Sequence, residues 1–299
     1  MQSEERSRES WGSTVTVVLV PAIFGVTNGR QVGSALLANA YAARGHFPVV
    51  FQQDRRGANE TIGFVLVFSL IVLTVGVVLT AGYSGLQDAR DAERVNNAER
   101  AFDVLADNIE DITHREAPSR GTEIRLAEAS IGSGPPTHIN ISGFKNGSRV
   151  FTTGNYSTDS VVYRAEDTRI RYAGGAVTRI QGGGSTLLDP PGFVISQNHT
   201  IIPTVKLLVE DRTVAGAQTV LIRTDRSIRE VEISENGGVD TLQFNVSTPA
   251  PDAWEGYLEG QGMSCTRTEQ GSDRAKLSCT LEDVERVKTV WFLIEITFE

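Results

Sequence analysis

The chain has 299 residues, a formal net charge of −9, and only four lysines among its 28 basic residues. Residues 1–57 hold six arginines and four acidic residues, so the remainder carries 22 basic against 33 acidic residues, a net charge of −11. This composition excludes the clustered basic footprint of a nucleic-acid-binding protein and suits a salty exterior, although arginine-rich codon usage explains the arginine bias equally well.

Residues 1–54 show no recognisable structural pattern. Their apolar stretch Thr14–Val26 contains Pro21 and follows a segment without a positive N-terminal region, so it fits neither a membrane span nor a secretory signal. We expect translation to start further along, at Val49 or Val50, so that residues 1–57 reduce to a short leader.

The main apolar run extends from Thr61 to Gln87 and contains no charged residue. Fourteen of the 20 residues Ile62–Ala81 are Val, Leu, Ile or Phe, which together contribute about −4 to −8 kcal/mol to insertion as a membrane helix. A buried helix of a soluble protein is the alternative, but such helices seldom run this far without a polar side. The sequence therefore predicts a transmembrane helix over residues 62–83.

A basic pair and a small residue, Arg55-Arg56-Gly57, stand just before this helix. Their position differs from that of a secretory cleavage site, which follows its apolar run. The segment resembles the class III signal of archaeal type IV pilins and pilin-like proteins, particularly the haloarchaeal kind. The resemblance implies that a prepilin peptidase cuts after Gly57 and leaves Ala58 as the mature N-terminus. In one departure from the family, Glu60 would be the third mature residue, whereas bacterial pilins carry a glutamate at the fifth.

The charges that flank the apolar run predict its orientation. Arg55 and Arg56 precede the run, and Asp88 and Asp91 follow it. The positive-inside rule then places the leader in the cytoplasm and the chain after Gly85 outside. We expect a single-pass protein of the cell membrane, or of a surface filament, with an extracellular C-terminal domain.

The helix is expected to continue beyond the membrane to Ala117, with Pro118 and Gly121 ending it, so that residues 58–117 would span about 90 Å if unbroken. Apolar residues recur three and four apart on one face of its second half: Val95, Ala98, Phe102, Leu105, Ile109 and Ile112. Two interpretations of this stripe remain open. It packs on the protein's own globular domain, it is shared between that domain and neighbouring subunits, or both.

Beyond Gly121, short alternating segments separated by turn residues predict an antiparallel β-sandwich or barrel. The predicted strands are Glu123–Ala129, His138–Ile141, Ser160–Arg164, Thr168–Tyr172, Ala176–Ile180, Ile201–Val209, Gln218–Arg223, Ile228–Ile233, Thr241–Val246 and Thr289–Phe298. One short helix is expected at Ala253–Leu258, with Asp252 as its N-cap. The glycine-rich joints at residues 174–175, 182–184 and 237–238 are expected to be hairpin turns.

Cys265 and Cys279 are the only cysteines. They flank a turn candidate at residues 270–273, which fits a hairpin closed by a cross-strand disulfide that contributes about 3 kcal/mol. Two free buried thiols are the alternative, but an exterior location favours pairing. A metal site is not expected, because no histidine lies near the cysteines in the sequence.

Asparagines in the pattern Asn-x-Ser/Thr recur in the β-rich region: Asn140, Asn146, Asn155, Asn198 and Asn245. Grouped on predicted loops and strand ends, they predict a glycosylated surface. Asn59 fits the same pattern but would lie on the cytoplasmic side of the membrane.

The sequence contains no catalytic constellation. The four histidines are scattered, and no His-Glu-x-x-His pair, Gly-x-Ser-x-Gly elbow or Walker loop occurs. We therefore predict no enzyme, no cofactor and no metal. The predicted fold class is α+β, in which a long transmembrane and then amphipathic helix precedes an antiparallel β-sandwich-like, pilin-like extracellular domain at residues 121–299.

The resemblance implies a structural or adhesive surface protein whose partners are the membrane, a prepilin peptidase, and identical or related pilin subunits with their assembly machinery. No nucleic-acid partner is expected. An unassembled single-pass membrane protein whose β-domain binds a ligand or a sensory partner is the alternative. A third possibility is an extracellular hydrolase that assembles acidic residues from distant parts of the chain.

Overall fold

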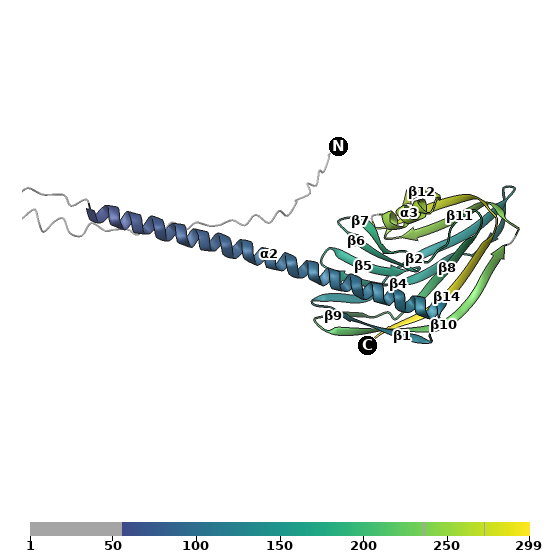
Figure 1. Cartoon of the computed structure of the whole chain (residues 1–299), viewed down its shortest axis with the longest axis horizontal. Helices are drawn as coiled ribbons and strands as arrows, with labels where there is room; N and C mark the ends of the chain where they lie inside the picture. The colour runs from purple at the N-terminus through teal and green to yellow at the C-terminus, as the bar shows by residue number, and fades with distance from the viewer. Residues whose placement is uncertain (1–55, 236, 272) are drawn as a thin grey trace, which may run out of the picture. The chain divides into compact units, whose positions relative to one another are not determined.

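The computed structural model describes residues 56–235, 237–271 and 273–299. One long helix precedes a β-rich domain built from curled sheets (Figure 1), which confirms the α+β class. The proposed start at Val49 or Val50, the rest of the leader and Arg55 lie outside the described residues.

Two helices and fourteen strands make up the described chain. The helices are α2 (Arg56–His114) and α3 (Pro251–Gly260). The strands are β1 (Ser119–Arg125), β2 (Ala129–Lys145), β3 (Ser148–Thr152), β4 (Tyr156–Ala165), β5 (Thr168–Ala173), β6 (Ala176–Gln181), β7 (Gly184–Asp189), β8 (Thr200–Val209), β9 (Thr213–Gly216), β10 (Thr219–Glu235), β11 (Val239–Thr248), β12 (Ser264–Glu269), β13 (Ala275–Val284) and β14 (Val287–Phe298).

The strands form two sheets. The small sheet has the order β1-β10-β14-β8, and the large one has the order β12-β13-β11-β2-β4-β5-β6-β7, with β3 and β9 also paired to β2. The expectation of a wholly antiparallel arrangement is wrong at one place, because β8 and β14 pair in parallel. The chain between them runs through β9 to β13, which provides the long crossover that parallel neighbours need.

Two predicted strands at 218–223 and 228–233 are one continuous strand, β10. Its pairing with β14 shifts register between Arg226 and Ile228 and again between Val231 and Ile233, so bulges carry the strand through the interruption. The predicted strand Glu123–Ala129 is wrong in its second half. Ala127 and Glu128 have φ of 47° and 71° and turn the chain from β1 into β2.

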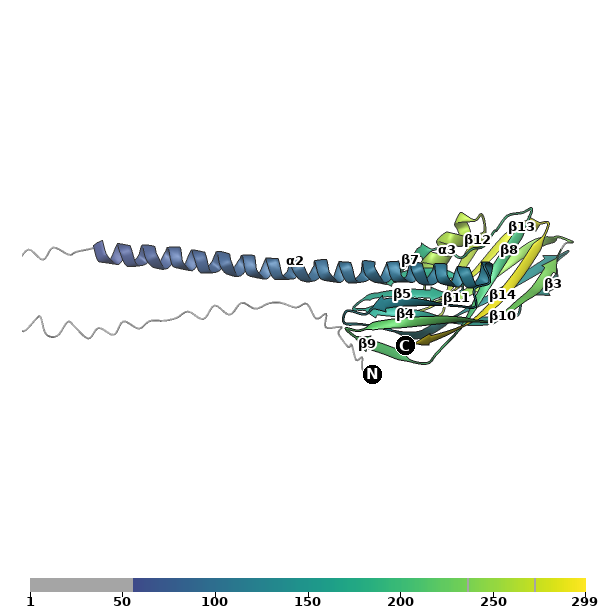
Figure 2. The same ribbon diagram turned by 60° about the horizontal axis from the view of Figure 1, so that its bottom comes forward.

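The apolar stripe of α2 lies in the first of two cores. This core joins the stripe to buried residues of both sheets, including Ile131 on β2, Tyr163 on β4 and Ile294 on β14. Phe102, Leu105 and Ile112 have no exposed surface. In Figures 1 and 2 the C-terminal part of α2 lies along the strands of the β-domain. The stripe therefore packs on the protein's own domain, as the first interpretation expects.

The second core lies under α3. Trp254 of α3, which is 1% exposed, packs against Phe193 and Phe244 with ring centroids 6.2 and 6.3 Å apart. Tyr257 joins the cluster and donates a hydrogen bond from its hydroxyl to the carbonyl oxygen of Pro191. Burial raises the pKa of Tyr257 to about 12. The predicted short helix is therefore confirmed, and it contributes buried residues to the second core.

The predicted N-cap of α3 is wrong. Ala250 occupies the N-cap position without a side-chain cap, and Asp252 lies inside the first turn. Its carboxylate accepts a hydrogen bond from the backbone N–H of Ser185 at 2.8 Å and pairs with Arg267 at 2.6 Å. The side chain thus ties α3 to β7 and β12, and these partners lower its pKa against the effect of burial.

The glycine joints differ in what they connect. Gly174 and Gly175, with φ of 64° and 88°, turn β5 into β6 as predicted, and the glycines at 182–184 turn β6 into β7. The prediction fails at residues 237–238, because β10 and β11 belong to different sheets. This joint is a crossing between the sheets, not a hairpin turn.

Candidate functional site

The first half of α2 exposes its apolar surface completely. Every described side chain from Thr61 to Arg90 is exposed, so the apolar run has no buried residue. Phe64 is 71% exposed and Leu79 is 66% exposed. Contiguous apolar surface of this extent needs a nonpolar environment. The described chain therefore contains one candidate membrane-spanning helix, in the place where the sequence predicts it.

The expected peptidase site lies at the start of this helix. Arg56, Gly57 and Ala58 are in the first turn of α2, while Arg55 is not among the described residues. A cut between Gly57 and Ala58 would require that turn to open. The first four N–H groups of a helix have no partner within the helix, so opening the first turn breaks few hydrogen bonds.

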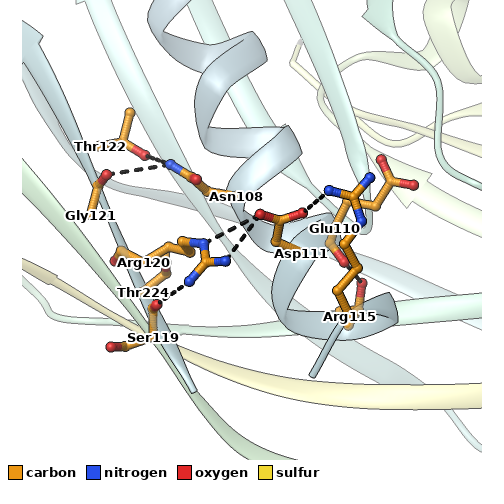
Figure 3. Close-up of polar contacts among 10 residues, drawn as sticks. Asn108, Glu110, Asp111, Arg115, Ser119, Arg120, Gly121, Thr122 and Thr224 are labelled. Atoms are coloured by element: carbon orange, nitrogen blue, oxygen red, sulfur yellow. Dashed lines mark hydrogen bonds and ion pairs between the residues drawn. The ribbon is translucent and has the colours of Figure 1, made fainter. Parts of the chain in front are cut away.

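The C-terminal end of α2 is attached to β1 by polar contacts (Figure 3). Asn108 donates from Nδ2 to the hydroxyl oxygen of Thr122 at 2.9 Å and to the carbonyl oxygen of Gly121 at 3.3 Å. One turn later, Asp111 pairs with Arg115 at 2.8 Å and with Arg120 at 3.2 Å. These contacts join the helix to the strand that follows it.

The helix ends three residues before its predicted end. Glu116 has φ of 61°, which reverses the chain, and the N–H of Ala117 donates to the carbonyl oxygen of Asp111 at 3.3 Å. The hydroxyl of Thr224 on β10 donates a hydrogen bond to the carbonyl oxygen of Arg120 on β1 at 3.0 Å, which holds the two strands together. Exposed ion pairs contribute little to stability, so we infer that these contacts set the direction of the joint while the buried stripe supplies its stability.

One face of the large sheet, opposite the second core, carries polar side chains. Apolar and polar residues alternate along β2, β11 and β13, and Ile139, Phe244 and Leu277 point into the core. Residues paired across strands share a face. The remaining set, here called the polar face, is His138, Asn140 and Ser142 on β2, Gln243, Asn245 and Ser247 on β11, and Lys276, Ser278 and Thr280 on β13.

Two of the five glycosylation sequences lie on the polar face. Asn140 and Asn245 are half-buried register partners in the middle of β2 and β11, so their expected location on loops or strand ends is wrong. A strand places residues i and i+2 on one face, and the glycosylation pattern needs Asn at i and Ser or Thr at i+2. A polar face rich in these residues therefore produces the pattern by alternation alone.

The other three asparagines lie on connections and are exposed. Asn146 is in the turn between β2 and β3, Asn155 lies between β3 and β4, and Asn198 precedes β8. In contrast, Nδ2 of Asn140 is already used, because it donates to Thr152 at 3.0 Å and to the carbonyl oxygen of Gly154 at 2.6 Å.

We expect the native protein to carry glycans at Asn146, Asn155 and Asn198, and to leave Asn140 and Asn245 bare. Attachment at Asn140 would replace one of the two amide hydrogens that it donates within the protein, whereas the loop asparagines are open to solvent. Mass spectrometry of peptides from the native protein, before and after glycan removal, measures occupancy at each position. Occupied strand asparagines beside bare loop asparagines would contradict this assignment.

A groove of about 500 Å³ opens on the polar face. Its lining includes His138, Asn140, Asn155, Asn245, Arg274 and Lys276, together with Val246, Ser247 and Gln270. Among the described residues that line it there is no carboxylate. Sequence analysis singled out three of these residues, but only as glycosylation candidates. The alternation along β2, β11 and β13 indicates which residues of each strand share a face, but it does not indicate that the three strands lie side by side.

Two arginines lie beside a bulge in β2 near this groove. The bulge falls between Gly134 and Thr137. Arg171, 2% exposed, donates to the carbonyl oxygen of Pro135 at 2.7 Å, and Arg274 donates to that of Pro136 at 2.6 Å. Burial, and then the positive charge of Arg274, lowers the pKa of Arg171. No ion pair with a carboxylate occurs for either arginine among the described residues, so their positive charge is uncompensated.

The disulfide between Cys265 and Cys279 is present, with the two residues directly paired across β12 and β13. It joins the exposed edge strand β12 to the sheet that carries the polar face. Among the described residues, no group of three or more His, Cys, Asp or Glu side chains could hold a metal ion.

Comparisons with other proteins give one result. No curated protein matches the chain, and no solved structure matches it. One family matches residues 56–297, which is most of the described chain and includes the apolar helix, the polar face and the disulfide. The chain therefore belongs to DUF7289, a family of unknown function.

Proposed function

We propose that this chain is a type IV pilin-like cell-surface protein, cut after Gly57, anchored through α2, and displaying its β-domain outside the membrane. Its role is structural or adhesive, in a surface filament or in the envelope. The observation that carries the proposal is helix α2 itself. Its uncharged apolar run follows Arg55-Arg56-Gly57 in the sequence and is exposed from Thr61 onward, and the apolar stripe of its second half is buried against the β-domain.

Two further features support an exterior location. A disulfide persists in oxidising surroundings such as the cell surface, and Cys265 and Cys279 form one. The exposed sequons at Asn146, Asn155 and Asn198 fit a glycosylated surface. The family match begins at Arg56, beside the expected cut.

The test is the N-terminal sequence of the membrane-associated protein, from cells with and without prepilin peptidase. We expect a start at Ala58 only when the peptidase is present. Arg55→Gln together with Arg56→Gln should abolish the cut. The matched control, Arg90→Gln with Arg100→Gln, removes two exposed arginines from the same helix and should be cut normally. An envelope-bound chain that keeps its arginine pair in the presence of the peptidase would refute the proposal.

An unassembled single-pass membrane protein with a ligand-binding β-domain is the second candidate, and the groove on the polar face favours it. The two candidates differ in where the cut protein is found. A filament subunit is recovered in filaments sheared from the cell surface, whereas an unassembled anchor stays with the membrane fraction.

A further inference from the structure

The groove on the polar face is positively charged in a negatively charged protein. The whole chain carries a net charge of −9, yet the described lining contains Arg274 and Lys276 and no carboxylate. Lys276 is exposed, and no ion pair or hydrogen bond of its side chain occurs within the described part of the chain. This charge distribution favours an anionic ligand.

Arg274 is held in place by neutral groups. Its guanidinium donates to the carbonyl oxygen of Pro136 at 2.6 Å and to that of Ser247 at 3.2 Å. A guanidinium has five N–H donors, so these bonds leave donors for a ligand. Because its partners are uncharged, its positive charge remains available to a bound anion.

The rest of the lining consists mainly of amides and hydroxyls. Asn245 and Gln270 offer both donors and acceptors, whereas both amide hydrogens of Asn140 are donated within the protein and Asn155 is an expected glycan attachment point. The Nδ1 atom of His138 is buried without a hydrogen-bond partner among the described atoms. Buried polar atoms normally have a partner, so the ring of His138, which lines the groove, is sensitive to a change in its surroundings.

We propose that this groove binds a saccharide that carries a carboxylate or sulfate group, with the anion near Lys276 and Arg274 and the sugar hydroxyls on the amide side chains. A volume of about 500 Å³ fits a few sugar rings. No aromatic side chain is among the described lining residues, so stacked nucleobases have no platform there. The inference goes beyond the proposed function and does not depend on leader cleavage or assembly.

Calorimetric titration of the full chain in detergent micelles tests this inference. The protein comes from a host that adds no N-glycans, because Asn155 lines the groove and is itself a sequon. The probes are trigalacturonate, neutral maltotriose and inorganic sulfate, in about 0.15 M NaCl to limit long-range effects. We expect trigalacturonate to bind with a Kd of about 1 mM, and maltotriose and sulfate to bind at least about tenfold more weakly.

Two matched lysine variants locate the site. Lys276→Gln should weaken trigalacturonate binding about fivefold or more, whereas Lys288→Gln removes another exposed lysine, on β14, and should leave binding unchanged. The imidazole nitrogen resonances of His138 should shift on titration with trigalacturonate.

Three results would overturn the assignment. If maltotriose bound as tightly as trigalacturonate, the anionic group would play no part in recognition. If Lys276→Gln and Lys288→Gln weakened trigalacturonate binding equally, the effect would come from the overall charge of the protein. If sulfate bound as tightly as trigalacturonate, the groove would be a site for simple anions. None of these outcomes bears on the N-terminal sequence, so the proposed function is judged separately.

Discussion

Replacing Leu105 by alanine is expected to lower the free energy of unfolding of the β-domain by about 2–5 kcal/mol. Leu105 has no exposed surface and lies in the first core, between α2 and both sheets. The loss combines the transfer free energy of the deleted methyl groups with that of the cavity left behind. Since small domains are stable by only about 5–15 kcal/mol, the variant should melt at a visibly lower temperature.

The matched control is the neighbouring residue. Val104 is 49% exposed on the same helical turn, so Val104→Ala should change the unfolding free energy by less than about 0.5 kcal/mol. Urea unfolding of the full chain in detergent, followed by tryptophan fluorescence, measures both variants. If the stripe instead stabilised contacts between subunits, Leu105→Ala would leave the isolated protein unchanged and impair assembly.

Removing the disulfide should have an effect of similar size. The double variant Cys265→Ala, Cys279→Ala opens a loop whose ends are 14 residues apart, and the chain-entropy model gives a loss of about 3 kcal/mol. Because β12 pairs only with β13 among the described strands, its amide protons should show the largest increase in hydrogen exchange.

Thr266→Ala serves as the control, since Thr266 is exposed on β12 next to Cys265. It should stay within about 0.5 kcal/mol of the parent protein. Reduction of the parent with dithiothreitol should reproduce the double variant. Parent and double variant with the same urea midpoint would show that pairing along β12 suffices without the covalent bond.

The parts of the fold that repeat locally could be predicted from the sequence. The candidate membrane-spanning helix follows from an uncharged run, and the stripe from Ala98 to Ile112 follows from apolar residues three and four apart. The hairpin of β12 and β13 follows from two cysteines on either side of a turn. In each case the partners are close in sequence, so the pattern is complete within one short segment.

The parts that depend on distant pairing could not be predicted. Asn140 and Asn245 are direct neighbours across two strands that are far apart in the chain, and the groove exists only because β2, β11 and β13 lie side by side. The parallel pairing of β8 with β14 has the same cause. Local propensity also misplaced the N-cap of α3, because Arg267 and Ser185 engage Asp252 instead.

The position of β14 has a consequence for the order of events during synthesis. This strand is the last of the described chain, and it lies between β10 and β8 in the small sheet. The pairing of β10 and β8 with β14 cannot form before Val287–Phe298 has left the ribosome. The small sheet, and with it the first core that includes Ile222 and Leu207, therefore closes only after that strand has been translated.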